Sequence, residues 1–334
     1  MRPLAATILA ALVTSINASK SPGCGHATPP NLTPGHASTG LTIDVPAAGG
    51  TRNYLLNLPQ TYDVTKSQPL ILAFHGKAQD AAQFEAQTQL TDPEFNAMGA
   101  VVAFPEGINK QWLGDPESPP KKDLDDIAFA QKLYEHLVED YCVDLSRVYI
   151  VGFSNGGGLT NLLACDLKFS SHVAAATIVS GAVYKDKSLK GNEPLFDVCN
   201  PARSPLPIFE LHGSKDPVIH YDGKSTPDGE TYPIDEWVAG WRERNGCGGK
   251  TREEAISIHK GTVAKKSWYC EDEEVVTHYC IEGFGHGWPS KQRQEDDGQR
   301  YGPLEWNGTR DILHFLGSKV LPARSQSGSP RDEL

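Results

Sequence analysis

Short, uninterrupted apolar runs that alternate with segments of helical spacing constrain this chain most. Residues 70–74 and 100–104 are continuously apolar, and residues 147–151 form a third strand-like run. Continuous apolar runs are typical of strands buried on both faces. Interleaved with them, residues 127–141 and 156–165 carry helical spacing. Strands that alternate with helices predict βαβ units, so we expect an α/β fold with a mainly parallel central sheet flanked by helices.

The length of 334 residues and the 39% of apolar residues fit one large domain with a sizeable core. We expect this domain, the catalytic one in the argument below, over residues 41–322. Residues 19–40 are rich in Pro, Gly, Ser and Thr and predict a loosely ordered leader, and residues 323–334 predict a flexible tail. Residues 185–206 and 287–306 are the longest irregular stretches and could form lids or substrate walls.

The charge balance argues against two classes of partner. Lys and Arg number 31 against 42 Asp and Glu, so the formal net charge is −11. An acidic surface repels phosphate backbones and anionic lipids, which argues against nucleic-acid binding and against docking on membranes.

The two ends of the chain resemble targeting signals for different destinations. Arg2 followed by the apolar residues 4–13 is typical of a secretory signal peptide over residues 1–18, too short to span a bilayer. The alternative is an apolar N-terminal helix. The last four residues, Arg331-Asp332-Glu333-Leu334, differ by one residue from the retrieval signal of the endoplasmic reticulum. We therefore expect secretion, with retrieval and a chance match of the tail as the two interpretations of the C-terminus.

Cysteines and sequons agree with an oxidising secretory compartment. Seven cysteines suggest three disulfides and one free thiol, whose pairing the sequence does not assign. No C-x-x-C pair occurs in the sequence, so we expect no zinc site and no other metal site. Asn31 and Asn307 each begin an N-x-Thr sequon and are candidate glycosylation sites.

Gly152-Phe153-Ser154-Asn155-Gly156 matches the pattern G-x-S-x-G. The pattern alone is weak, but here it follows an apolar strand and precedes a helix, as a nucleophile elbow requires. A turn this tight leaves no room for a Cβ at the glycine positions. Ser154 is then placed at the carboxyl end of a strand, beside a helix N-terminus that favours a developing oxyanion. We predict that Ser154 is a nucleophile.

A serine nucleophile needs a base and an acid, which follow it in the order acid, then histidine, in α/β-hydrolases. Asp216 follows the strand expected at residues 207–211 and is the preferred acid, with Asp222 as its competitor. His286 lies on a glycine-rich loop after the strand expected at residues 275–281. Imidazole changes its protonation near neutral pH, as a proton shuttle requires. The alternatives to His286 are His220, His259, His278 and His314.

The oxyanion that forms during acyl transfer needs two N–H donors. In α/β-hydrolases one comes from the residue after the nucleophile and the other from the loop after an early strand. The backbone amides of Asn155 and Lys77 are the candidates here. His75, two residues before Lys77, is expected to be a structural hydrogen-bonding residue rather than a base.

These motifs occur in an order that resembles the fungal secreted feruloyl esterases, a group that also contains acetyl xylan esterases and polyhydroxybutyrate depolymerase-like enzymes. The resemblance spans roughly residues 40–320. The matching motifs are His75-Gly76, Pro105-Glu106-Gly107, Trp112, Asp125-Asp126, Gly152 to Gly157, His212-Gly213 with Asp216, Gly285-His286 and Trp288-Pro289.

The resemblance implies an α/β-hydrolase fold and a catalytic triad of Ser154, Asp216 and His286. It implies hydrolysis of feruloyl (hydroxycinnamoyl) esters on plant cell-wall polysaccharides such as arabinoxylan, without a metal or organic cofactor. Trp112 and Trp288 could present apolar faces to a phenolic ring or a sugar, with loop packing as the equal alternative.

Two other hypotheses stay open from the sequence. The same fold could act on short acyl groups, as an acetyl xylan esterase or a polyester depolymerase, because pocket shape decides between these substrates. A non-catalytic binding protein on a hydrolase scaffold is the alternative of a different class. The presence of Ser154, Asp216 and His286 together argues against the binding protein.

Overall fold

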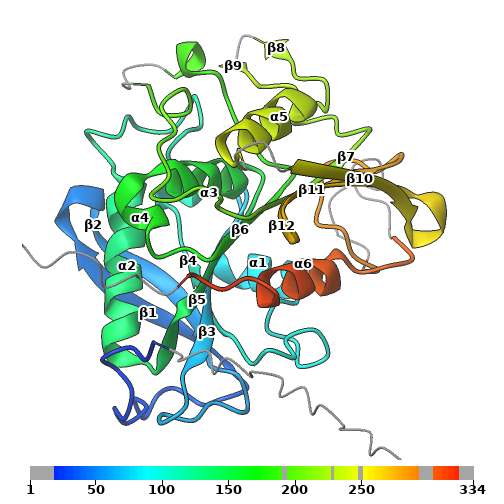
Figure 1. The fold of residues 1–334 in the computed structure, drawn as a ribbon. Helices are drawn as coiled ribbons and strands as arrows, with labels where there is room; N and C mark the ends of the chain where they lie inside the picture. Colours follow the sequence, from blue (N-terminus) through cyan, green and yellow to red (C-terminus); the bar gives the residue numbers. More distant parts are fainter. Residues whose placement is uncertain (1–18, 190–193, 227–228, 247–250, 293–303, 323–334) are drawn as a thin grey trace, which may run out of the picture.

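The computed structural model describes residues 19–189, 194–226, 229–246, 251–292 and 304–322. The expected signal peptide, the tail and its last four residues therefore lie outside the described residues. A ten-stranded sheet runs through the molecule in the order β1-β2-β4-β3-β5-β6-β7-β12-β11-β10 (Figure 1). Its strands are β1 (Ala37–Val45), β2 (Gly50–Asn57), β4 (Val101–Pro105), β3 (Gln68–Phe74), β5 (Val143–Phe153), β6 (Ala175–Val179), β7 (Ile208–Gly213), β12 (Glu273–Ile281), β11 (Val263–Cys270) and β10 (Thr251–Ile258).

The six central strands, from β4 to β12, are parallel to one another, and antiparallel pairs extend the sheet on both sides. The mainly parallel α/β architecture expected from the apolar runs is thus present. The carboxyl ends of β3, β5, β7 and β12 lie at one edge of the sheet, where ligands bind in folds of this kind.

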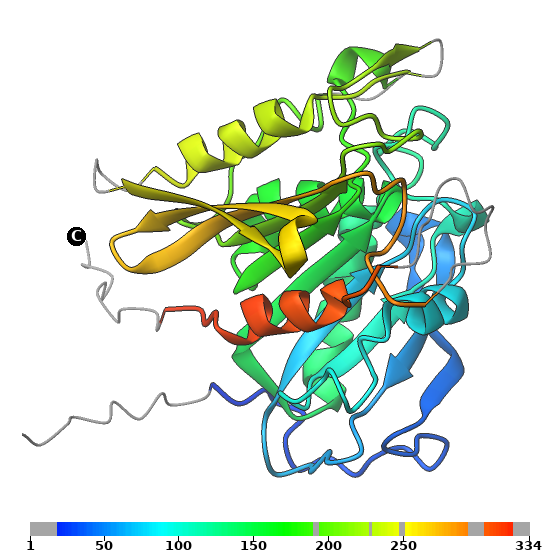
Figure 2. The same cartoon turned by 90° about the vertical axis from the view of Figure 1, so that its right-hand side faces the viewer.

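Helices cover both faces of the sheet, so that three layers result (Figure 2). Side chains of α2, α3, α4 and α5 contribute to one core, and those of α1 and α6 contribute to the other. Strand β3 shows the alternation, because Leu70, Leu72 and Phe74 face the first core while Ile71 and Ala73 face the second. The helices are α1 (Ala81–Thr88), α2 (Asp126–Asp140), α3 (Asn155–Cys165), α4 (Leu167–Ser170), α5 (Ile234–Arg244) and α6 (Gly308–Gly317).

The helix expected at residues 127–141 is α2, and its start has a local cause. The side chain of Asp125 accepts hydrogen bonds from the backbone N–H groups of Ile127 and Ala128, which caps the helix. Within α2, Asp126 is fully buried and pairs with Arg52 of β2 at 2.9 Å. The other oxygen of Asp126 accepts the N–H of Leu113 at 2.7 Å, so this pair also holds the segment that follows β4.

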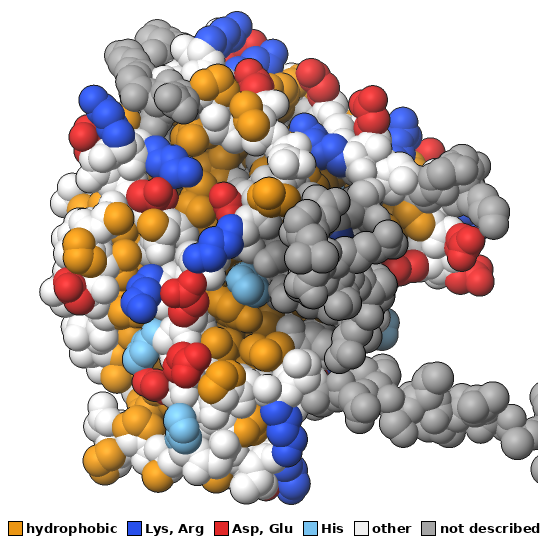
Figure 3. Space-filling view, turned by 60° about the vertical axis from the view of Figure 1, so that its left-hand side comes forward, with side chains coloured by type: hydrophobic (Ala, Val, Ile, Leu, Met, Phe, Trp, Pro, Cys, Tyr) orange, Lys and Arg blue, Asp and Glu red, His pale blue; other side chains and the backbone are white. Residues whose placement is uncertain are grey.

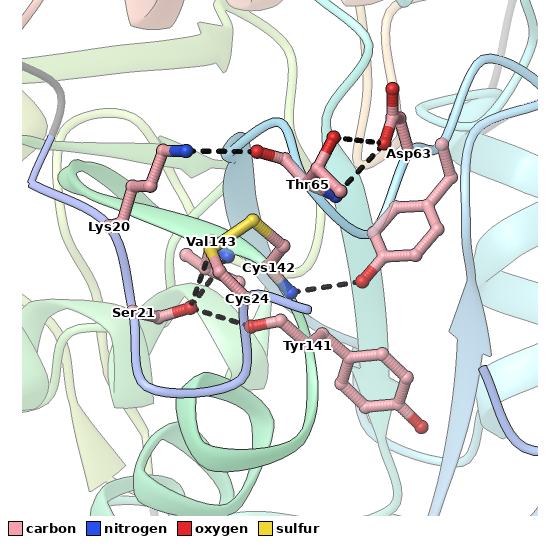
Figure 4. Close-up of a disulfide and its surroundings, with 9 residues drawn as sticks. Lys20, Ser21, Cys24, Asp63, Thr65, Tyr141, Cys142 and Val143 are labelled. Carbon is pink, nitrogen blue, oxygen red and sulfur yellow. Dashed lines mark hydrogen bonds between the residues drawn. A yellow bond between two sulfur atoms is a disulfide. The ribbon is translucent and has the colours of Figure 1, made fainter. Parts of the chain in front are cut away.

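The N-terminal segment is more ordered than predicted, which corrects the expectation of a loosely ordered leader over residues 19–40. Ser21 is buried, and its hydroxyl donates to the carbonyl of Tyr141 and accepts from the N–H of Val143. A disulfide joins Cys24 to Cys142 across 118 positions (Figure 4). Strand β1 then begins inside the predicted leader. These contacts are all non-local, so the Pro- and Gly-rich composition gave no sign of them.

The other cysteines agree with the expected count. A second disulfide joins Cys165, at the end of α3, to Cys199 in the irregular segment 185–206. Cys270 is also disulfide-bonded, and Cys280 is the free thiol among the described cysteines.

Sequence reasoning did not predict three strands of this sheet, namely β1, β10 and β11. β10 is exposed along nearly its whole length, so it lacks the alternation of a half-buried strand. It forms a hairpin with β11 that extends the sheet beyond β12.

On the face drawn in Figure 3, acidic and basic side chains lie interspersed among apolar ones. None of the helices in the described ranges is both long and apolar enough to cross a lipid bilayer.

Candidate active site

Ser154 lies at the sharp turn between β5 and α3. Its backbone has φ 53° and ψ −119°, an unfavourable conformation for a residue with a Cβ. The neighbouring glycines make the turn possible. A Cβ on Gly152 would lie 2.1 Å from the carbonyl oxygen of Gly156, and a Cβ on Gly156 would lie 2.1 Å from that of Phe74. The two glycines of the motif are therefore required by backbone packing, and the turn places the Ser154 hydroxyl above the end of β5.

The structure brings Ser154, His286 and Asp216 together from three elements far apart in sequence. His286 follows β12, and its Nε2 lies 2.8 Å from the Oγ of Ser154. Its Nδ1 lies 2.8 Å from Oδ2 of Asp216, which follows β7. All three side chains are mostly buried, with Ser154 8% exposed. This arrangement has the geometry of a nucleophile, a base and an orienting carboxylate.

Asp216 is held as a carboxylate. Its Oδ1 accepts the backbone N–H groups of Val218 and Ile219, each at 2.8 Å. Burial by itself raises the pKa of Asp216, but hydrogen bonds from His212 and His286 outweigh it and hold this pKa well below its usual range. The negative charge that orients His286 is therefore present at any pH at which the protein is expected to work.

The competing residues lie elsewhere. Asp222 is exposed, and His314 is exposed on α6. His220 bonds the amine of Lys224, and His259 pairs with Asp311. His278 is buried within β12, and it bonds Glu210 and Tyr221.

The two predicted oxyanion donors flank Ser154. β3 pairs with β5 in a register that places Phe74 opposite Gly152, so the loop that carries Lys77 starts beside the nucleophile turn. Asn155 is the first residue of α3, where backbone N–H groups have no partner within the helix. Among the described residues, the backbone N–H groups of Lys77 and Asn155 donate to no other backbone group. Neither backbone amide is thus bonded to another backbone group, as an oxyanion donor requires, and their role stays a prediction.

Side chains fix the two donor loops. The side-chain amide of Asn155 accepts from the backbone N–H of Trp112 at 2.7 Å and donates to the backbone carbonyl of Trp112 at 3.2 Å. The amine of Lys77 pairs with Asp115 at 3.1 Å and with Glu117 at 2.9 Å. His75 donates from Nδ1 to the carbonyl of Gly76 and serves a structural role, as expected.

The structure contradicts the substrate-binding interpretation of Trp112 and Trp288, because both rings are fully buried. The indole N–H of Trp112 donates to the carbonyl of His75, and its ring packs on the imidazole of His75. Trp288 donates to the hydroxyl of Thr309 and meets Phe84 edge to face. Both residues support the site loops from behind. An aromatic residue on a loop does not reveal its burial, which is why the sequence left packing as an alternative.

The two sequons differ in the folded structure. Asn31 is exposed, so its glycosylation stays a prediction. Asn307 caps α6 by accepting from the N–H of Thr309, and its amide donates to Gln89. The hydroxyl of Thr309 is buried and hydrogen-bonded to the carbonyl of Thr88. A glycan on Nδ2 of Asn307 would compete only with the hydrogen bond to Gln89, so glycosylation at Asn307 also stays a prediction.

Sequence reasoning assigned no role to Glu210 or to His212, which contacts Asp216. Both lie on β7 and are buried, and Glu210 bonds the imidazole of His212 at 3.0 Å. A signal was present, because a glutamate within an apolar strand requires a buried partner. No cluster of His, Cys, Asp or Glu suited to a metal ion occurs among the residues that the structure describes.

Comparison with known proteins finds esterases among the relatives of this chain. The sequence model of the family described as esterase PHB depolymerase matches residues 52–190. Feruloyl esterase B of Piromyces equi is 29% identical over 244 residues, which are 70% of this chain and 42% of that protein. Probable feruloyl esterase C of Aspergillus terreus is 30% identical over 226 residues, which are 66% of this chain and 71% of that protein.

Among solved structures, the acetyl xylan esterase from Aspergillus awamori superposes with a TM-score of 0.56 at 15% identity, covering 83% of this chain and 98% of that one. This likeness confirms the predicted α/β-hydrolase fold. The chain spans less than half the length of the Piromyces relative, so what that whole protein does is not carried over directly.

Proposed function

We propose that this chain, which belongs to the feruloyl esterase family of polyhydroxybutyrate depolymerase-like α/β-hydrolases, hydrolyses feruloyl (hydroxycinnamoyl) esters on plant cell-wall polysaccharides such as arabinoxylan. The observation that carries the esterase activity is the hydrogen-bonded series from Ser154 through His286 to Asp216. The family membership supports the choice of the acyl group. Neither a metal nor an organic cofactor has a part in the steps below.

Acylation begins when the Oγ of Ser154 attacks the ester carbonyl carbon. The hydroxyl proton moves to Nε2 of His286, and the new imidazolium is stabilised by the carboxylate of Asp216. The carbonyl oxygen becomes an oxyanion that accepts hydrogen bonds from the backbone amides of Lys77 and Asn155. The bond to the sugar oxygen then breaks as His286 returns the proton to that oxygen, which leaves a feruloyl-Ser154 ester.

Deacylation repeats these steps with water. His286 takes a proton from a water molecule as its oxygen attacks the carbonyl carbon of the acyl-enzyme. The tetrahedral intermediate collapses, the bond to Ser154 Oγ breaks, and the proton on His286 returns to that oxygen. Ferulate leaves, and the resting enzyme is restored.

The test compares methyl ferulate with a short acetyl ester on purified wild type and on Ser154→Ala. Loss of the hydroxyl removes the covalent step, so we expect the wild type to cleave methyl ferulate and the variant to lose roughly 10⁴-fold or more in kcat/KM. Circular dichroism and the thermal midpoint verify that the variant is folded. Wild-type turnover by a folded Ser154→Ala would overturn the mechanism.

The same assay separates the rival functions. Cleavage of the acetyl ester alone would keep the triad and move the substrate to acetylated or polyester material. A protein that cleaves neither ester and resists a fluorophosphonate probe would be a binding protein. The probe needs only an activated serine, so it reports the triad independently of the acyl pocket.

We also propose that the protein is exported. The support is the disulfides at Cys24–Cys142 and Cys165–Cys199, which form in oxidising compartments, together with the signal peptide expected over residues 1–18. Expression of the full chain in a secreting host, with activity assayed in medium and lysate, tests this. Activity confined to the lysate would contradict it.

A further inference from the structure

A series of buried polar side chains continues behind Asp216, away from Ser154. Its members are Glu210 and His212 on β7, His278 on β12, and Tyr221 in the loop after β7. Glu210, His212 and His278 are each at most 1% exposed. A buried charged group is costly unless it is paired, so this series needs an explanation that the catalytic steps above do not supply.

Among the described residues, the two ring nitrogens of His212 contact only hydrogen-bond acceptors. Its Nδ1 lies 3.0 Å from Oε1 of Glu210. Its Nε2 lies 2.8 Å from the carbonyl oxygen of Ile219 and 3.3 Å from Oδ2 of Asp216. With Glu210 ionised on one side, and a carbonyl and the Asp216 carboxylate on the other, both ring nitrogens carry protons. The contacts therefore require an imidazolium.

Electrostatics agree with the geometry. Burial lowers the pKa of His212, but hydrogen bonds to Asp216 and Glu210 outweigh it and raise the pKa to about 10. Burial raises the pKa of Glu210, but the charges and hydrogen bonds of His278 and His212 outweigh it and hold this pKa below its usual range. His212 and Glu210 thus form a buried ion pair near the carboxyl end of β7.

Among the described residues, polar groups from β12, α5, β11 and the triad surround this pair. From β12, Nδ1 of His278 bonds Oε2 of Glu210 at 2.6 Å, and the thiol of Cys280 lies near Tyr221. The hydroxyl of Tyr221 lies 2.7 Å from Nε2 of His278 and donates to Asp235, at the start of α5, at 3.1 Å. Lys266 of β11 approaches the same carboxylate at 3.6 Å. On the side of the triad, the described ionisable groups are Asp216 and, beyond it, His286.

Oδ2 of Asp216 is the point where this network meets the triad. That oxygen lies 2.8 Å from Nδ1 of His286 and 3.3 Å from Nε2 of His212. We propose that His212, held as an imidazolium by Glu210, positions Asp216 and offsets part of its charge, so that His286 stays unprotonated at lower pH. The role rests on the proposed esterase activity, since His212 acts through Asp216 and contacts no substrate.

The sign of the effect follows from Coulomb's law. The Asp216 carboxylate favours the protonated form of His286, and a cation on the other side of that carboxylate weakens this preference. Without the cation, His286 would take up its proton at higher pH and would cease to act as a base there. Activity would then be lost earlier on acidification.

Two variants remove the cation by different routes. His212→Gln deletes the imidazolium, whereas Glu210→Gln keeps the ring but removes the counter-ion that holds its second proton. For both we expect the acidic limb of the kcat/KM profile to move up by about one pH unit and the plateau to fall about tenfold. His220→Gln is the matched control, because His220 follows the same strand but bonds Lys224 instead, and it should leave the profile unchanged.

The pH dependence is measured twice, with an ester substrate and with the rate of fluorophosphonate labelling. If the wild type is active and the folded variants keep its acidic limb, the role of His212 is overturned while the esterase proposal stands. If the wild type neither cleaves esters nor labels, both are overturned.

If the variants fail to fold, a measurement on the wild type alone still tests the proposal. At pH 8 ordinary histidines are neutral, because their pKa is about 6.5. Nitrogen-15 spectra of histidine-labelled protein should still show at least one ring with both nitrogens protonated. The absence of any such ring at pH 8 would overturn the proposal.

Discussion

The ends of β3 and β7 carry the same dipeptide and use it in opposite ways. His75-Gly76 follows β3, and His212-Gly213 lies at the end of β7; both imidazoles are buried. Burial lowers the pKa of His75 to about 4, whereas carboxylate partners raise the pKa of His212 to about 10. Equal burial therefore gives a neutral ring at one strand end and a cation at the other.

The hydrogen-bond partners explain the difference. Nε2 of His75 accepts the backbone N–H of Gly107 at 3.0 Å, so that nitrogen cannot also carry a proton. His212 has acceptors on both sides. The end of β3 is thus a neutral scaffold for a backbone donor loop, and the end of β7 is a charged support for Asp216. Partners, rather than depth, decide the charge of a buried histidine here.

We expect the largest loss of activity from a substitution at the charged end of β7. Asp216→Asn removes the carboxylate that orients His286 and that accepts from His212, so kcat/KM should fall by about 10⁴-fold at neutral pH. Steady-state kinetics on methyl ferulate measure the loss. The matched change at the neutral end, His75→Gln, should stay within about tenfold of the wild type. Similar losses from both substitutions would erase the distinction between the two strand ends.

The sequence was informative where a residue's role depends on its own segment. The strand, turn and helix around Ser154 are local, and the order of Asp216 and His286 along the chain indicated the rest of the triad. Partners from distant segments could not be predicted. Glu210 and His212 share β7 but meet His278 only because β7 pairs with β12.

The same reason explains the errors. The leader appeared loose from its composition because the partner of Cys24 lies 118 positions away. Trp112 and Trp288 were candidates for substrate contact because an indole suits both an exposed face and a core, and only the fold decides. Strand β10 is exposed on both faces, so hydrophobic periodicity could not reveal it.

A second, smaller effect distinguishes the histidines by stability. The pKa of His75 is about 4 in the folded chain and about 6.5 when unfolded, so its contribution is present above pH 6.5 and lost as the pH falls toward 4. The pKa of His212 is raised to about 10, so its contribution is full below pH 6.5 and lost as the pH rises toward 10.

Thermal midpoints between pH 4.5 and 9.5 measure the two slopes. His75→Gln should flatten the acid side, and the double variant Glu210→Gln/His212→Gln should flatten the alkaline side, each by roughly 2–4 °C. His220→Gln is again the control and should follow the wild type across the range. A double variant that flattens the acid side instead would show that His212 is neutral in the folded protein.

We expect the smallest effect, on stability, at the neutral end of β3. There the indole N–H of Trp112 donates to the carbonyl of His75 at 2.9 Å. Trp112→Phe keeps an aromatic ring in the core and removes that hydrogen bond, which should cost about 1 kcal/mol of unfolding free energy, or about 2 °C in the thermal midpoint. Because the ring is fully buried, the KM for methyl ferulate should stay within about twofold of the wild type. A tenfold rise in KM with an unchanged thermal midpoint would instead show that Trp112 contributes to substrate binding. The end of β3 would then serve recognition as well as support.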